Sequence, residues 1–177
     1  MDDMFDLSME GHWVVLYDPD LVQADVAHEA LVFEDGLPPA APDGLVFLDF
    51  GDYEGGVRLR CTTGPLTPAE RALEDVTRQH QHAFHLASGT VYVEGGHATA
   101  EALGTLMDVL AHMGAPAEHP AVASAYRVRG WLAQFWLPPG RYTVTLHAIC
   151  FDLDEAPSPD IPNLVLHFAR QAVPLVT

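Results

Sequence analysis

The stretch that decides the fold is Arg141-Tyr-Thr-Val-Thr-Leu-His-Ala-Ile-Cys-Phe151. Apolar and polar residues alternate along it. The apolar set is Tyr142, Val144, Leu146, Ala148 and Cys150, and the polar set is Thr143, Thr145 and His147. Because successive side chains of a strand point to opposite faces, this alternation predicts a strand with one buried and one solvated face. Strands of this kind are typical of antiparallel sheets.

The same character recurs on both sides of this stretch. Short runs rich in valine and aromatic residues predict further strands at 12–17, 30–34, 45–50, 57–62, 90–94, 125–137 and 164–169. Alternation is clear again in Val57-Arg-Leu-Arg-Cys61 and in Tyr126-Arg-Val-Arg129. Pro138-Pro139-Gly140 separates two long runs and is a strong turn signal, so we predict a hairpin there.

Two segments in the middle of the chain have helical patterns. Thr67-Pro-Ala-Glu70 forms a capping box with proline at the first helical position, and apolar residues at helical spacing continue to about Ser88. A second apolar stripe covers 99–113 and is closed by Gly114. We therefore predict a single domain over 1–177 that is mainly β: an antiparallel β-sandwich with a two-helix insertion over 64–120. An α+β fold with helices covering one sheet is the alternative.

Composition places the chain among globular proteins. Its 177 residues are 49% hydrophobic, which is enough for a sizeable core. The start is acidic, whereas a secretory signal begins with basic residues, and no apolar run approaches the roughly 20 residues that span a bilayer. We therefore expect a cytoplasmic protein. Cys61 and Cys150 lie in apolar runs without CxxC spacing, so we expect buried thiols.

The charge is notable for what is missing. The chain has 25 acidic residues and only 8 basic ones, all arginine, for a net charge of −17. No base occurs in residues 1–57, whereas the acids there are Asp2, Asp3, Asp6, Glu10, Asp18, Asp20, Asp25, Glu29, Glu34, Asp35, Asp43, Asp49, Asp52 and Glu54. Such a surface repels nucleic acid and anionic membranes and attracts basic proteins. The alternative is that the charge serves solubility alone.

The acidic first third is the predicted partner-binding surface. Its candidate residues are Asp18, Asp20, Asp25, Glu34, Asp35, Asp49, Asp52 and Glu54. The last three lie in an acidic turn over 49–56, which could instead collect a divalent cation such as calcium through carboxylates and carbonyls. Its spacing is not that of an EF-hand, and an ordinary acidic loop is the simpler interpretation.

Half of the arginines fall on two alternating strands. If these strands are neighbours, Arg58, Arg60, Arg127 and Arg129 form a cationic stripe able to hold a carboxylate or phosphate. Pairing with the protein's own acids is the alternative use of these side chains. Trp136 lies on the face opposite Trp131 and Phe135, so it is a candidate ligand contact.

The histidines suggest one possible metal site. His82 and His85 are three residues apart in the first predicted helix, so they share a helix face and could bind zinc with a third ligand from elsewhere. A polar helix end is the alternative. The sequence has no HExxH, GxSxG, Walker A or GxGxxG motif, which favours a binding protein without a cofactor over an enzyme.

The run Phe135-Trp-Leu-Pro-Pro-Gly-Arg-Tyr-Thr-Val144 resembles the F-x-L-P-x-G-x-Y-x-V hairpin of bacterial immunity-type β-sandwich proteins, such as the competence protein J group of nuclease inhibitors. The resemblance covers about the first 60 and the last 45 residues. It implies an inhibitor of a basic effector. We therefore expect a non-catalytic protein that binds a basic partner, with a metal-binding module or metal-dependent enzyme and a small-ligand-binding β-sandwich as alternatives.

Overall fold

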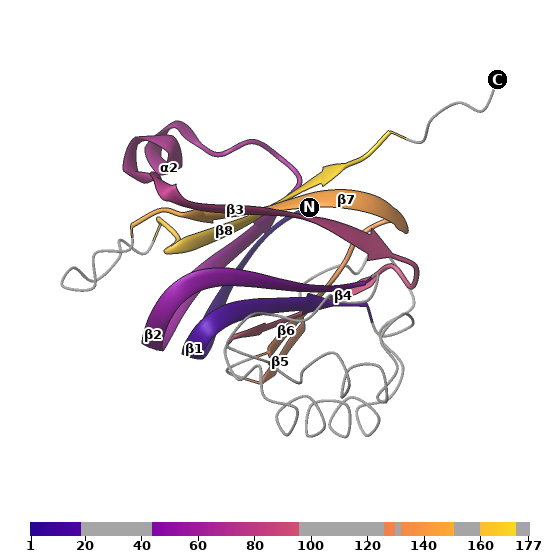
Figure 1. Ribbon diagram of the computed structural model, residues 1–177, viewed down its shortest axis with the longest axis horizontal. Coiled ribbons are helices and arrows are strands. Elements are labelled where there is room, and N and C mark those ends of the chain that lie inside the picture. The colour runs from indigo at the N-terminus through magenta and orange to yellow at the C-terminus, as the bar shows by residue number, and fades with distance from the viewer. Residues whose placement is uncertain (19–43, 96–125, 130–131, 151–159, 173–177) are drawn as a thin grey trace, which may run out of the picture.

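The computed structural model describes residues 1–18, 44–95, 126–129, 132–150 and 160–172 (Figure 1). Within these ranges hydrogen bonds join eight strands into one sheet, in the order β3-β7-β8-β2-β1-β4-β6-β5. The elements are β1 (Asp2–Tyr17), β2 (Leu45–Thr62), α2 (Pro68–Leu73), β3 (Asp75–Leu86), β4 (Thr90–Gly95), β5 (Tyr126–Arg129), β6 (Leu132–Trp136), β7 (Gly140–Ala148) and β8 (Leu164–Arg170). The prediction of a mainly β protein is confirmed.

Two long strands, β1 and β2, shape the sheet. They pair with each other antiparallel along most of their length. The C-terminal end of β2 pairs with β8, whereas the C-terminal end of β1 pairs with β4. Because the remaining strands attach to opposite ends of this pair, the sheet folds over itself: β3, β7 and β8 form one layer, and β4, β5 and β6 belong to the other (Figure 1).

Aromatic side chains fill the space between the layers. Phe135 from β6 lies 6.3 Å from Phe5 of β1 and 5.4 Å from Phe168 of β8, measured between ring centroids. Such contacts contribute roughly 0.5–1.5 kcal/mol each beyond the burial of their area. The deciding stretch behaves as predicted, because Tyr142, Val144, Leu146 and Ala148 are all buried in this core. Cys61 is buried as expected, and Cys150 is partly exposed.

The first predicted helix is wrong over most of its length. The capping box is present, since Glu70 N donates to Thr67 Oγ1 and Thr67 N donates to Glu70, but α2 ends at Leu73. Residues 75–86 form β3, which pairs antiparallel with β7. Without β3, β7 would leave its hydrogen-bonding groups unpaired on that side, and this non-local demand outweighs local helix propensity. The second predicted helix and the strand at 30–34 lie outside the described residues.

Three further expectations need correction. The acidic turn over 49–56 is part of the continuous strand β2: Asp49 and residues 53–56 pair with β1, and residues 50–52 fall at the register shift between Gly11 and Trp13. The run 125–137 is divided into β5 and β6, which pair antiparallel with each other. The sheet is also not purely antiparallel, since β2 and β8 run parallel. Sequence alternation reports which face is buried and carries no information on strand direction.

The Pro138-Pro139-Gly140 segment does not close a hairpin. It carries the chain from β6 in one layer to β7 in the other, alongside the segment 87–89, which joins β3 to β4. Leu137 N donates to Gly89 O at 2.9 Å, and the Tyr142 hydroxyl donates to Pro138 O at 2.5 Å. A tyrosine that bonds a carbonyl a few residues upstream is a device by which β-sandwich proteins fix such corners.

In the parts of the chain given above, no helix is both long and apolar enough to cross a membrane.

Candidate functional site

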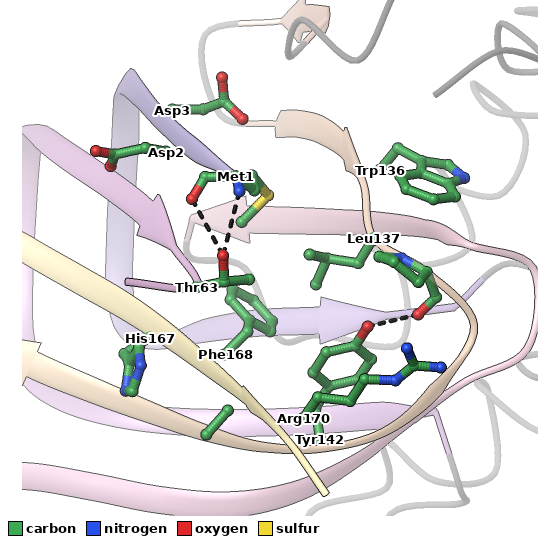
Figure 2. Close-up of a pocket in the computed structure, with 12 residues that line it drawn as sticks. Met1, Asp2, Asp3, Thr63, Trp136, Leu137, Tyr142, His167, Phe168 and Arg170 are labelled. Carbon is green, nitrogen blue, oxygen red and sulfur yellow. Dashed lines mark hydrogen bonds between the residues drawn. The ribbon is translucent and has the colours of Figure 1, made fainter. Parts of the chain in front are cut away.

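A pocket of about 670 Å³ opens between the two layers, where β1 begins and β6 and β8 end. Figure 2 shows Asp2, Asp3 and Met1 on one side of it and Trp136 and Leu137 on another. The pocket continues the hydrophobic core outward, because Phe168 and Tyr142 belong to both. It is the candidate site because it joins a partly apolar concavity to charged groups at its rim.

Asp3 is the most unusual group in the pocket. Along β1, Phe5, Leu7 and Met9 are buried in the core, and Asp3 occupies the next position of this inward-facing row. Burial raises the pKa of the Asp3 carboxyl, against the opposing effect of the Met1 amine. Within the part of the chain that the structure describes, no hydrogen bond or ion pair reaches this carboxylate. Asp3 is therefore a partly desolvated negative charge without a hydrogen bond from the described residues, and the charge of the Met1 amine only partly offsets its desolvation.

Trp136 is held in place by a close approach to Gly89. A Cβ atom added at Gly89 would lie 2.8 Å from Trp136 Nε1 and 3.3 Å from Leu137 O, and the Gly89 φ of +83° also favours glycine. The indole is only partly buried, so part of the ring remains available in the pocket. Trp136 thus presents a partly exposed aromatic ring in the pocket, and its role as a ligand contact stays a prediction.

Arg170 lies on a different wall of the pocket from Asp3 (Figure 2). Its Nη2 donates to Pro139 O at 2.9 Å, and its Nε would lie 3.1 Å from a Cβ at Gly140. The guanidinium therefore braces the 138–140 segment against the end of β8. It also places one positive charge on this wall.

Asp2 belongs to a charge network on the outer side of the sheet. Arg60 Nε donates to Asp2 Oδ1 at 2.6 Å, and Arg60 Nη1 donates to Glu70 Oε2 at 2.6 Å. Arg60 and Glu70 are both buried, whereas Asp2 is exposed. The hydrogen bond from Arg60 holds the pKa of Asp2 below its usual value. This network docks α2 on β2 and leaves Arg60 no charge to offer a ligand.

His167 lines the pocket, and its ring lies 6.3 Å from the ring of His147, which contacts Glu74. Burial lowers the pKa of His167, with the nearby His147 ring and Arg60 as smaller causes. His147 Nδ1 lies 2.6 Å from Glu74 Oε1, which suits donation to that carboxylate. His147 Nε2 is buried, and no partner for it is found among the described residues. The pair of His147 and Glu74 joins the end of α2 to β7.

The predicted partner-binding acids have different surroundings. Asp18 is fully buried, and its carboxylate accepts hydrogen bonds from Ala87 N and from Ser88 N, the latter at 2.9 Å. It therefore fixes the segment between β3 and β4 and is not part of an exposed surface. Asp49 is half-buried in β2. Asp52 and Glu54 also lie in β2 with side chains outside the described set, and Asp20, Asp25, Glu34 and Asp35 fall entirely outside it.

The four arginines of the predicted stripe do not come together. Arg58 and Arg60 are on β2, whereas Arg127 and Arg129 are on β5, and β1, β4 and β6 separate these strands in the sheet. Arg58 Nε lies 3.1 Å from Asp6 Oδ1, and Arg60 is held by Asp2 and Glu70. On β2 the arginines thus pair with the protein's own acids. The side chains of Arg127 and Arg129 lie outside the described set.

His82 and His85 do not share a face. Both lie on β3, where residues three apart point to opposite sides, so the helical spacing behind the predicted metal site is absent. Burial and the neighbouring His80 lower the pKa of His82. Across the described ranges, no group of three or more histidine, cysteine or carboxylate side chains is placed to hold a metal ion.

Comparison with known proteins adds no relative: no family model, no curated protein and no solved structure matches the chain. The site must therefore be argued from its own residues. Sequence reasoning identified Trp136 and missed Asp3, Arg170 and the pair of His147 with Glu74. A signal for Asp3 exists, because Asp3-Met-Phe-Asp-Leu-Ser-Met9 places an acid in an otherwise apolar alternating row.

Proposed function

We propose that this protein is a non-catalytic, acidic β-sandwich protein of the bacterial cytoplasm that binds a basic protein partner. The observation that carries the proposal is the use of its few arginines. Arg58, Arg60 and Arg78 pair internally with Asp6, with Asp2 and Glu70, and with Asp75, so these arginines are directed at the protein's own acids. With a net charge of −17, the surplus carboxylates attract a protein of opposite charge.

The resemblance to immunity-type proteins suggests the kind of partner. It rests on the 135–144 run, which here carries the chain between the layers and includes the Tyr142 bond to Pro138 O. A basic nuclease or toxin is the partner that this resemblance implies. Opposite potentials would speed association with such an effector and select it among other proteins.

Affinity capture from the native host at two salt concentrations tests the proposal. The tagged full chain is expected to retain a basic protein at about 50 mM salt and to release most of it at about 500 mM, since screening shortens the range of exposed charges. Binding of the purified partner should then show a steep loss of association rate with salt. Retention of acidic proteins only, or affinity that is independent of salt, would contradict the proposal.

One alternative retains a specific observation. A small-ligand-binding protein is favoured by the 670 Å³ pocket with Trp136 at its rim, a volume within the range of small-molecule sites. The metal-binding alternative has no comparable support, because β3 directs His82 and His85 to opposite sides. A ligand screen by thermal shift on the full chain distinguishes a small-ligand protein from a protein that responds only to a macromolecular partner.

A further inference from the structure

Building on the proposed function, we propose that the pocket between the layers receives one basic side chain of the partner protein. The guanidinium or ammonium group of that side chain pairs with Asp3. Its aliphatic stem lies against Trp136.

Asp3 lies in a row of β1 that is otherwise apolar. An acid in the inward-facing row of Phe5, Leu7 and Met9 loses water without gaining a hydrogen bond from the described parts of the chain. A partly buried charge without a partner is unfavourable for folding. A cation that enters the pocket would compensate it and would form a charge-assisted hydrogen bond there.

The basic groups near the pocket already form contacts within the protein. Arg60 binds Asp2 and Glu70 on the outer side of β2. The Met1 amine donates to Thr63 Oγ1 at 3.1 Å (Figure 2), and Arg170 donates to Pro139 O. Among the described side chains no base is hydrogen-bonded to Asp3, so we assign the pairing cation to a second molecule.

The lining of the pocket suits the shape of a basic side chain. Arginine and lysine bury their aliphatic stems along apolar surfaces and keep the charge at the end. In the pocket lining the partly exposed Trp136 provides such a surface, and its ring attracts a cation that passes over its face. Leu137 and Phe168 are each only 1% exposed and back this surface from the core. Arg170 disfavours a second positive charge on its wall. The pocket thus suits a single cation with a neutral remainder.

The test uses a peptide with one positive charge. Acetyl-Gly-Arg-Gly amide is titrated into the full chain at about 20 mM salt by NMR, with the same peptide containing neutral citrulline as the comparison. We expect binding of the arginine peptide and at least about tenfold weaker binding of the citrulline peptide, because citrulline cannot form a charge-assisted hydrogen bond with Asp3.

Two variants with the same net charge separate the pocket from the general field. Asp3→Asn and Asp6→Asn both lie on β1, but Asp6 is exposed and pairs with Arg58 on the other face. We expect Asp3→Asn to weaken peptide binding at least about tenfold, Trp136→Leu to weaken it about threefold, and Asp6→Asn to change it less than about twofold. Equal losses in Asp3→Asn and Asp6→Asn would overturn the assignment of the pocket.

Three further outcomes are decisive. If butylguanidinium binds through Asp3 but the arginine peptide does not, the pocket takes a small organic cation and the proposal is wrong. If the host partner is captured with unchanged affinity by Asp3→Asn, the pocket proposal fails while the proposed function stands. If the peptide binds through Asp3 but no basic protein is captured, the proposed function fails instead.

Discussion

At the scale of the residue, we expect Asp3 to lower the stability of the fold and to strengthen binding of the partner. Its place in the inward-facing row of β1 would be filled best, for stability alone, by an apolar side chain like those of Phe5, Leu7 and Met9. Proteins retain such locally unfavourable residues where a site requires them. A residue of this kind has a signature that can be measured: its neutral replacement should stabilise the fold and weaken binding.

The stability part of this signature depends on pH. Burial raises the pKa of Asp3 above its unfolded value of 3.8, so the folded state holds this proton more tightly and its stability falls as pH rises through the raised pKa. Asp3→Asn removes the effect. We expect a higher urea midpoint than wild type at about pH 7 and no difference at about pH 3, where Asp3 is protonated in both states. A lower midpoint at pH 7 would mean that the carboxylate stabilises the fold.

At the scale of the element, the short helix α2 is held by one buried ion pair. Its six residues are too few to be stable alone, and Glu70 both completes the capping box and binds Arg60. A buried pair is costly to break on one side, because the remaining charge has no partner, whereas removing both charges is often neutral.

This asymmetry predicts the result of a double-mutant cycle. Arg60→Met leaves Glu70 buried without a base and should cost about 3–5 kcal/mol of unfolding free energy. Glu70→Gln keeps the capping box, so adding it to Arg60→Met should recover most of the loss. Urea unfolding of the four proteins gives the coupling energy directly. Additive losses would show that the two side chains do not interact in solution.

The elements also show how far the sequence alone can lead. The alternation in β7 and the capping box at Thr67 are local signals, and both predictions are correct. β3 is different, because its strand conformation is imposed by the open side of β7, a partner more than 50 residues away along the chain. The prediction of an arginine stripe was wrong for the same reason, because it depended on strand order, which is a non-local property. Trp136 was identified from its own strand face, whereas the neighbours that make it a site come from β1 and β8.

At the scale of the whole molecule, charge acts on folding and on binding in opposite directions. The surplus carboxylates that give the net charge of −17 repel one another most strongly in the compact, folded state. Exposed ion pairs such as Arg58 with Asp6 and Arg78 with Asp75 stabilise the fold, but they contribute only about 0–1 kcal/mol each. Sodium chloride shortens the screening length from about 30 Å at 0.01 M to about 8 Å at 0.15 M, so the surplus of like charges should dominate the response.

We therefore expect the thermal midpoint at about pH 7 to rise between 0.01 and 0.15 M sodium chloride, a range set by the screening lengths above. Near the sequence pI of about 4.6, where the net charge vanishes, the same change should have little effect. A midpoint that falls at pH 7 would show that internal ion pairs outweigh self-repulsion. A rising midpoint would also sharpen the binding experiment: salt that stabilises the fold cannot release the partner by unfolding it, so the release would report the electrostatic contact itself.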